Sequence, residues 1–254
     1  MLIVSLLSDF GTSDSYVAEV KAVLLSQSPS LVLVDISHQV APGDVRAAAF
    51  LIERTWWRFP PGTVHLVVVD PGVGSERAAL AIAFRDHFFV GPDNGVFTFL
   101  LGDPGARIAS LPIPPDASPT FHGRDLFAPA AASLANRGWF PTLGQEPPSK
   151  EPHRLVRAEP RLEPKGWSGE IIHIDRFGNL ITNLSTKNVP STALLSIHSE
   201  PGIPIVRTYA QVPVGTLLAY GGSGGTLEIA VREGSAAERL KAKVGDRVLA
   251  QQER

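Results

Sequence analysis

The first half of the chain alternates between strand-like and helix-like segments, and no other feature constrains the fold as much. Residues 2–7, 31–36 and 64–69 are short apolar runs, as expected of parallel strands that are covered on both faces. Between them, residues 16–27 and 44–59 carry apolar side chains at helical spacing and are followed by prolines. Units of this length favour right-handed crossovers between parallel strands. We therefore expect an α/β domain with a mostly parallel sheet flanked by helices.

The same domain continues less regularly. Residues 79–84 and 87–90 flank Arg85 and Asp86, which predicts a hairpin or a mixed edge of the sheet. The Ala-rich segment 125–136 predicts a third helix.

A change in composition marks the end of this domain. Five prolines fall between residues 147 and 164, separated by charged residues, so we interpret residues 146–167 as a linker. Short strand-like segments bounded by turn residues follow, a pattern typical of a small antiparallel barrel. These segments are residues 169–175, 180–184, 194–198, 203–209, 216–220, 226–231 and 246–251. The predicted domains are an α/β domain over residues 1–145 and a smaller all-β barrel over residues 168–254.

The composition excludes several classes of protein. The 254 residues include 23 Lys and Arg against 25 Asp and Glu, and no basic stripe suits a nucleic-acid partner. The chain has no cysteine, which excludes disulfides, thiolate nucleophiles and cysteine-based metal sites. The apolar run at residues 2–7 is too short for a signal peptide or a membrane span. We expect a cytoplasmic protein with neither nucleic-acid nor membrane partners.

Acidic residues and glycines recur where the predicted strands end. The first strand leads to Ser8-Asp9-Phe10-Gly11, the third to Asp70-Pro71-Gly72-Val73-Gly74, and a later one to Gly91-Pro92-Asp93-Asn94-Gly95. Aspartate and glycine are also ordinary turn residues. Ligands of open α/β sheets, however, bind outside the carboxyl ends of the strands, so the three segments predict an Asp-rich pocket there. None has the spacing of a dinucleotide or nucleoside-triphosphate loop, which argues against NAD binding and ATP hydrolysis.

The histidines give no metal motif, since neither HExxH nor HxH occurs. His173 and Asp175 share a strand face, but without a third ligand nearby they support zinc only weakly, and we expect no metal. His122 lies in the polar turn Thr120-Phe121-His122-Gly123-Arg124-Asp125 directly before the third helix. Free N–H groups at such a turn can bind anions or carbonyls. A solvated loop histidine would explain the same pattern.

Together these segments resemble one enzyme family. Residues 8–11 with Asp14, 70–74 with Arg77, 91–95 and the turn around His122 resemble the S-adenosyl-L-methionine hydrolases, or hydroxide adenosyltransferases, whose relatives are fluorinating and chlorinating enzymes. The resemblance continues through residues 174–179, 222–225 and 227–230, so it covers nearly the whole chain in order.

The resemblance implies hydrolysis of S-adenosyl-L-methionine to adenosine and L-methionine, without a cofactor, by attack of water or hydroxide on the ribose C5′. It implies an N-terminal α/β domain, a C-terminal β-barrel and a homotrimer, with each site between the N-terminal domain of one subunit and the C-terminal domain of the next. The chemistry is plausible because the leaving thioether is neutral and needs no general acid; the site must orient the nucleophile and exclude bulk water.

The resemblance also implies roles for single residues. Asp70, Arg77 and His122 would hold the attacking water. The substrate-binding residues, with the group that each contacts, would be Asp9 (ribose hydroxyls), Asp14 and Asp175 (methionine ammonium), Phe177 and Asn179 (adenine), Ser223 (methionine carboxylate) and, with no specified group, Phe121. Without the resemblance, residues 175–179 would be interpreted as a plain hairpin turn.

Two alternatives stay open. The halogenating relatives place Tyr at position 70, Thr at 73 and Ser at 123, whereas this chain has Asp70, Val73 and Gly123, which favours water over halide. Halide addition to the same carbon is one alternative, and a non-catalytic protein that binds an adenosine derivative is the other. Gly43 stands where relatives often have an aromatic ring against the ribose, and Arg232 lies in a segment where they commonly have Asn, so neither residue is among the expected adenosine contacts.

Overall fold

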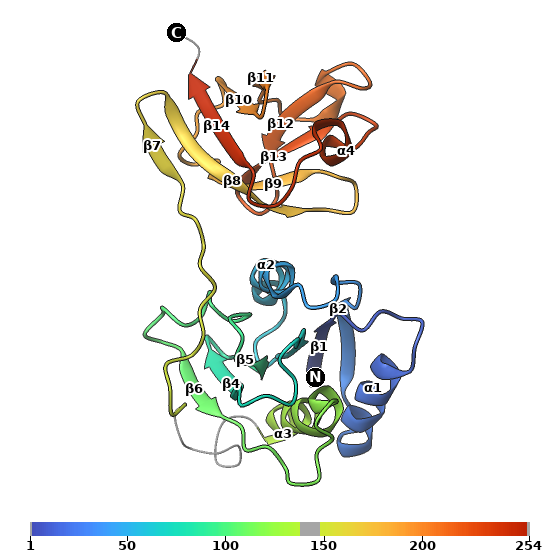
Figure 1. Ribbon diagram of the computed structural model, residues 1–254. Coiled ribbons are helices and arrows are strands. Elements are labelled where there is room, and N and C mark those ends of the chain that lie inside the picture. The colour runs from blue at the N-terminus through green and yellow to red at the C-terminus, as the bar shows by residue number, and fades with distance from the viewer. Residues whose placement is uncertain (1, 138–147, 253–254) are drawn as a thin grey trace. The chain divides into compact units, whose positions relative to one another are not determined.

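The computed structural model describes residues 2–137 and 148–252, which divide into two compact units, Met1–Leu155 and Val156–Arg254 (Figure 1). Each unit has its own sheet, so the prediction of two domains is confirmed. The predicted linker is too long at its C-terminal end, because β7 (Arg161–Glu163) and β8 (Gly166–Ile174) already belong to the second sheet. The predicted end of the first domain at residue 145 and the first linker residues, 146 and 147, lie outside the described residues.

The N-terminal unit is built on a six-stranded sheet of order β2-β1-β3-β5-β4-β6. Its strands are β1 (Ile3–Ser8), β2 (Val32–Ser37), β3 (Val64–Val68), β4 (Ala79–Phe84), β5 (His87–Pro92) and β6 (Arg107–Ser110). The pairs β1–β2, β1–β3 and β3–β5 are parallel, whereas β4 runs antiparallel to both β5 and β6. The predicted hairpin at residues 79–90 is thus present, and it turns the sheet from parallel to antiparallel.

Helices pack on both faces of this sheet. On one face, α1 (Tyr16–Gln27) and α3 (Ala128–Arg137) bury apolar side chains against β1, β3 and β5. On the other face, α2 (Val45–Thr55) packs against β1, β3, β4 and β5. The Asp44 carboxylate caps α2 by accepting the Ala47 N–H. Trp56–Arg58 form a 3₁₀ turn, so the α-helix ends before the predicted residue 59.

The third helix begins later than predicted. Gly123–Phe127 form one π-helical turn, and α3 starts at Ala128 rather than at residue 125. The turn around His122 therefore leads directly into a helix whose alanines are buried against the sheet. None of the helices within residues 2–137 and 148–252 is long and apolar enough to cross a membrane.

The C-terminal unit is an antiparallel sheet of order β11-β10-β14-β8-β9-β13-β12, to which β7 adds by pairing with β8. The remaining strands are β9 (Leu180–Ser185), β10 (Ala193–Ile197), β11 (Glu200–Pro204), β12 (Leu217–Gly221), β13 (Thr226–Val231) and β14 (Arg247–Gln252). A bridge between Ile205 and Ala219 brings the chain after β11 against β12, so the sheet nearly closes into a barrel.

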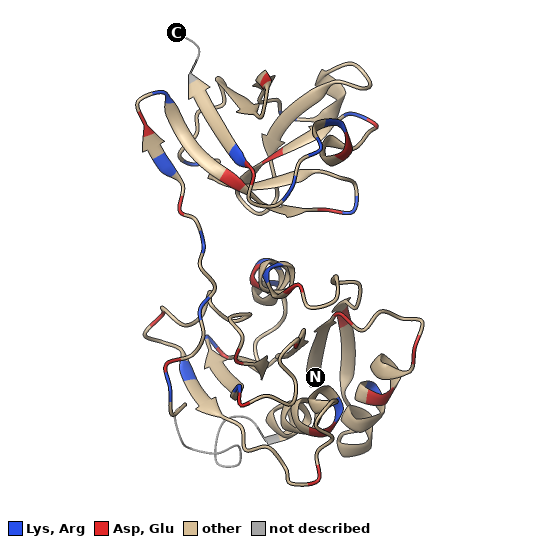
Figure 2. Cartoon of the chain, in the orientation of Figure 1, with Lys and Arg blue, Asp and Glu red and all other residues tan. Residues whose placement is uncertain are grey.

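Two details of the second domain differ from the prediction. The strand predicted at residues 203–209 lies at Glu200–Pro204, and Tyr209–Gln211 form a 3₁₀ turn instead. A short helix, α4 (Ala236–Leu240), is added to the strands, and the Ser235 side chain caps it. Lys and Arg positions are interspersed with Asp and Glu positions along the described parts of both units (Figure 2).

Candidate active site

Loops at the carboxyl ends of β1, β3 and β5 carry the three Asp and Gly segments, as the strand pattern predicts. These three strands are neighbours in the sheet, so their loops lie at one edge. A direct bond links two of the loops, since the Asn94 side-chain amide donates to the Val69 carbonyl oxygen at 2.8 Å. This bond holds the loops after β3 and β5 together.

Asp70, Arg77 and His122 form one hydrogen-bonded network. Arg77 Nε donates to Asp70 Oδ1 at 2.9 Å, and Arg77 Nη2 donates to Asp70 Oδ2. The same Nη2 lies 2.9 Å from His122 Nδ1. The Asp70 and Arg77 side chains are only 4% and 8% exposed, and His122 is 3% exposed. The structure thus brings together the three residues that the sequence analysis assigned to the attacking water.

The network fixes the protonation of His122. A guanidinium only donates hydrogen bonds, so Nδ1 must be the unprotonated acceptor and the neutral ring carries its proton on Nε2. Burial and the neighbouring Arg77 charge lower the pKa of His122, and Asp70 and Asp125 oppose that shift only in part. His122 is therefore a neutral imidazole that can donate through Nε2–H at neutral pH.

Close backbone packing brings the His122 turn to the Asp70 loop. Gly74 has a φ of +78°, and a Cβ there would lie 2.6 Å from the Pro119 carbonyl oxygen, so only glycine fits. Gly123 is less tightly confined, because a Cβ would lie 3.2 Å from both Phe10 and Val68 side-chain atoms, which would have to move slightly. Gly74 thus allows the segment at Pro119, far along the chain, to reach the loop after β3.

The other predicted ligands of this unit have different surroundings. Asp9 is partly buried, and its Oδ2 accepts the Gly43 N–H at 2.8 Å. Asp14 lies in the exposed loop before α1. Phe121 packs edge-to-face on Phe10 and Tyr16, with ring centroids 5.8 and 5.4 Å apart. All three residues belong to the same unit as the Asp70 network.

The segment at residues 91–95 has a structural use that the sequence analysis did not separate from ligand binding. Asp93 accepts the backbone N–H of His153 at 2.8 Å, and partial burial raises the pKa of its carboxyl. Asn94 also accepts the Val96 N–H at 3.2 Å with its side-chain oxygen. Asp93 thus holds the segment at His153 against the loop after β5, and Asn94 fixes the conformation of that loop.

In the C-terminal unit, residues 175–179 form a tight hairpin turn. Asp175 Oδ1 accepts the backbone N–H groups of Phe177 and Asn179, both at 2.9 Å, and Oδ2 accepts from the Asn179 side chain at 2.9 Å. A Cβ on Gly178 would lie 2.1 Å from the Ser235 hydroxyl oxygen, so that position also requires glycine. The Phe177 ring is 76% exposed. The turn thus uses Asp175 locally and presents Phe177 to its surroundings.

Ser223 is exposed in the turn between β12 and β13, which the Gly225 N–H to Gly222 carbonyl bond closes at 3.0 Å. Beside this turn lies a buried carboxylate that the sequence analysis did not assign. Glu228 Oε2 accepts from the Tyr220 hydroxyl at 2.6 Å, and Tyr220 accepts from the Tyr209 hydroxyl at 2.8 Å. The sequence signal for this buried carboxylate was a glutamate within the otherwise apolar segment LEIAV.

Comparisons with known proteins agree with these motifs. The model of the SAM hydroxide adenosyltransferase N-terminal domain matches residues 4–144, and that of the C-terminal domain matches residues 169–249. A Thermus thermophilus protein named (R)-S-adenosyl-L-methionine hydrolase is 44% identical, over 94% of this chain and 95% of its own length. A protein of the same name from Salinispora tropica is 36% identical, over 96% of each chain.

More distant relatives and a solved structure complete the comparison. A protein named fluorinase from an Actinoplanes species is 27% identical over 90% of each chain. The crystal structure of an uncharacterized conserved protein from Thermotoga maritima superposes with a TM-score of 0.89 at 34% identity, covering 97% of this chain and 99% of that one. The chain belongs to the SAM hydroxide adenosyltransferase family.

Proposed function

We propose that this protein hydrolyses S-adenosyl-L-methionine to adenosine and L-methionine. The observation that carries the proposal is the buried Asp70–Arg77–His122 network at the carboxyl ends of the parallel strands, in a chain whose hydrolase relatives match over almost its full length. Hydrolysis at C5′ needs a positioned water or hydroxide and a proton acceptor. The network supplies a guanidinium and a neutral imidazole to position the nucleophile, and a carboxylate to accept a proton.

The bond changes balance without a cofactor. A water or hydroxide oxygen forms a bond to the ribose C5′ while the C5′–S bond breaks. The electron pair of the broken bond stays on sulfur, which becomes the neutral thioether of methionine. The Arg77 charge favours hydroxide over water. His122 Nε2–H donates to that oxygen, because Nδ1 is already occupied by Arg77. When water is the nucleophile, its proton goes to Asp70, which keeps unused lone pairs beside its two bonds to Arg77. When hydroxide is the nucleophile, the 5′ hydroxyl forms directly and no proton is released.

The substrate-binding residues are proposed in two groups. Asp9, Asp14 and Phe121 come from the N-terminal unit and would contact the ribose and the methionine end. Asp175, Phe177, Asn179 and Ser223 come from the C-terminal unit and would contact adenine and the amino-acid group. Since Asp175 and Asn179 bond each other in the hairpin, only their remaining lone pairs and amide hydrogens serve the substrate.

We further propose a homotrimer in which each site combines the N-terminal unit of one subunit with the C-terminal unit of the next. The support is the division of the proposed ligands between the units and the exposure of the Phe177 ring, which leaves its faces open to a ligand. Sedimentation of the active enzyme tests this proposal, and a monomer with full turnover would contradict it.

The relatives' names specify one form of the substrate. The sulfonium sulfur carries three different carbon groups and a lone pair, so it is a stereocentre, and the relatives are named for the (R) form. We propose the same preference here.

The two alternative functions have less support. A side chain at position 123 would be crowded by Phe10, Val68 and Phe121, so the Ser of the halogenating relatives does not fit without displacement of these neighbours. Asp70 is tied to Arg77, an arrangement that a Tyr at this position could not make. A protein that only binds adenosine derivatives would have no need of the buried network.

The decisive experiment is incubation with separated (R)- and (S)-S-adenosyl-L-methionine in ¹⁸O-labelled water, followed by chromatography and mass spectrometry. We expect adenosine with ¹⁸O in its 5′ hydroxyl, methionine, and faster loss of the (R) form. A 5′-halo-adenosine formed in the presence of halide would indicate halide addition. Bound but unchanged substrate after long incubation would indicate a binding protein. His122→Ala serves as the matched inactive control.

A further inference from the structure

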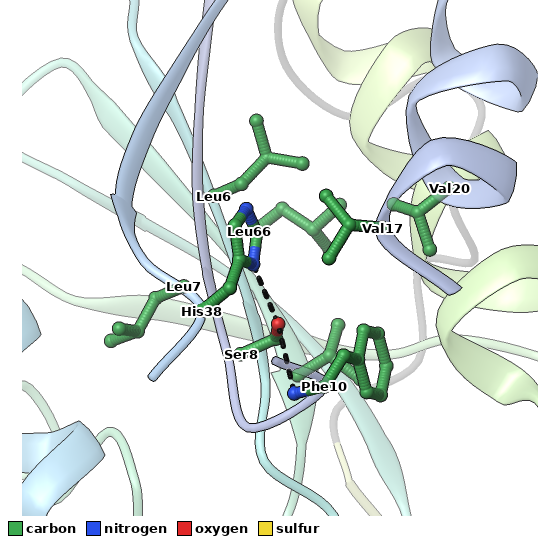
Figure 3. Close-up of a pocket in the computed structure, with 9 residues that line it drawn as sticks. Leu6, Leu7, Ser8, Phe10, Val17, Val20, His38 and Leu66 are labelled. Carbon is green, nitrogen blue, oxygen red and sulfur yellow. Dashed lines mark hydrogen bonds between the residues drawn. The ribbon is translucent and has the colours of Figure 1, made fainter. Parts of the chain in front are cut away.

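Behind the Asp9 loop runs a chain of polar side chains that the proposed reaction does not use. Ser8 Oγ, at the end of β1, lies 2.7 Å from His38 Nδ1 (Figure 3). His38 Nε2 lies 3.1 Å from Asp35 Oδ1, and Lys21 Nζ donates to Asp35 Oδ2 at 2.7 Å. Ser8 and His38 are only 3% and 6% exposed, whereas Asp35 and Lys21 reach the surface.

The segment that begins at His38 makes two hydrogen bonds to the Asp9 loop, one to the loop backbone and one to the Asp9 carboxylate. The His38 carbonyl oxygen accepts the Gly11 N–H at 2.7 Å, and Ser8 Oγ accepts the Phe10 N–H at 3.4 Å. The Gly43 N–H donates to Asp9 Oδ2 at 2.8 Å. The next two residues after Asp9, Phe10 and Gly11, are thus held by their N–H groups, and the Asp9 carboxylate is held by the bond from Gly43.

Apolar side chains surround the Ser8–His38 bond. The pocket in Figure 3 is lined mainly by side chains of β1, α1, β3 and the loop after β1, namely Leu6, Leu7, Phe10, Val17, Val20, Leu66 and Val68. In such surroundings, water does not replace a lost hydrogen bond, so the bond holds its two residues firmly. Ser8, at 3% exposed, is too buried to act as a nucleophile.

We infer that His38 is a positioning residue, which fixes the loop that presents the Asp9 carboxylate to the ribose of the substrate. The inference rests on the proposed role of Asp9 as a substrate ligand. Because the bonds between Asp9 and the ribose form in the ground state, loss of the His38 side chain should weaken substrate binding and leave the chemical step nearly unchanged.

Three variants test this chain by equilibrium binding and single-turnover kinetics. His38→Ala and Ser8→Ala each remove the bond, and we expect Kd for S-adenosyl-L-methionine to rise by about 3- to 10-fold with the single-turnover rate kept. His38→Asn places an amide oxygen near the position of Nδ1 and should restore most of the affinity. A rate loss as large as the affinity loss would overturn the inference.

The molecule contains a matched control. Ser5, on the opposite face of β1, makes the same kind of bond to His65 Nδ1 at 2.7 Å, and both residues are buried. Ser5→Ala should lower thermal stability about as much as Ser8→Ala but leave Kd unchanged. Equal effects of Ser5→Ala and Ser8→Ala on Kd would show that general loosening of the domain, not positioning, weakens binding.

A double variant separates the inference from the proposed function. If His38 acts through Asp9, then His38→Ala should weaken binding much less in the Asp9→Asn background than in the unaltered protein. Equal effects in both backgrounds would overturn the inference and leave the role of Asp9 intact. Unchanged Kd in Asp9→Asn alone would overturn the role of Asp9 and the inference with it, whereas absent turnover in the unaltered protein would overturn only the proposed hydrolysis.

Discussion

The Asp70 network and the Asp175 hairpin both centre on an aspartate, but they differ in what their contacts accomplish. Every hydrogen bond given above for the Asp175 carboxylate goes to a residue at most four positions away, and together they close a turn. The Asp70 network instead joins residues 7 and 45 positions apart and buries an ion pair. Burying a charge pair seldom adds stability over apolar residues of similar size, so fold stability does not explain the Asp70 network. The comparison indicates that the Asp70 network is a candidate site, whereas the Asp175 hairpin is a scaffold that presents Phe177.

The largest expected effect falls on the network. His122→Ala should lower the single-turnover rate by about 10²–10⁴-fold while Kd changes little, because in the proposed reaction the imidazole serves the attacking water rather than the substrate. Asp70→Asn should act in the same direction, and the two losses should not multiply, since both groups serve one nucleophile. His153→Ala, an exposed histidine of the same unit, is the matched control. Near-normal turnover in His122→Ala would remove the functional half of the comparison.

The histidines of the N-terminal unit also predict how its stability depends on pH. Burial, with a smaller contribution from the neighbouring His87, lowers the pKa of His65 to about 3. The unfolded chain, with a pKa of about 6.5, binds this proton more readily, so stability is full above pH 6.5 and falls as the pH drops toward 3. The limiting slope is about 1.4 kcal/mol per pH unit for one proton.

Denaturant unfolding at several pH values measures this slope. His65→Gln should reduce it by up to one proton, although the variant loses the imidazole bond to Ser5 and should be less stable at neutral pH. A slope that is unchanged in His65→Gln would assign the acid sensitivity to other groups, of which buried His87 and His122, both with lowered pKa values, are the first candidates.

A smaller effect is expected at the hairpin. Asp175→Ala removes the acceptor of three hydrogen bonds and should destabilise the protein by about 1–3 kcal/mol, measured by denaturant unfolding. Asp175→Asn keeps one acceptor oxygen for the two backbone N–H groups and should recover much of that stability. If Asp175→Asn is stable but binds substrate weakly, the negative charge of Asp175 contributes to substrate binding as well as to the turn. The contrast with the Asp70 network then becomes less sharp.

The sequence predicted the elements that carry their own apolar periodicity. The predicted bounds of α1 and β4 match the structure: β4 is buried along its whole length, and α1 buries Val20 and Leu24, one helical turn apart. The short elements β6, β7 and α4 have no such pattern and were not predicted. The bounds of β11 were wrong because this strand contains two prolines and a glycine, which read as turn residues.

The same distinction applies to the candidate site. The strand-end position of Asp70 followed from a local pattern, and the bond to Arg77 joins two ends of one loop. The bond to His122 depends on the close approach of the Pro119 backbone to Gly74, and only the resemblance to a family connected the three residues. The contact of His38 with Ser8 had no signal at all, since a histidine after a strand has no motif of its own.

The smallest expected change in stability, and the sharpest test of the hairpin as a scaffold, is at Phe177. Its ring is 76% exposed, so Phe177→Ala should alter the free energy of unfolding by no more than about 0.5 kcal/mol. If the ring packs on adenine, loss of that contact should weaken binding of adenosine by about 0.5–1.5 kcal/mol, or roughly 2- to 10-fold in Kd. Arg176→Ala, its exposed neighbour in the same turn, is the matched control and should leave Kd unchanged. Loss of stability with unchanged affinity would mean that Phe177 serves the hairpin, and the adenine contact would then have to come from another residue of the C-terminal unit.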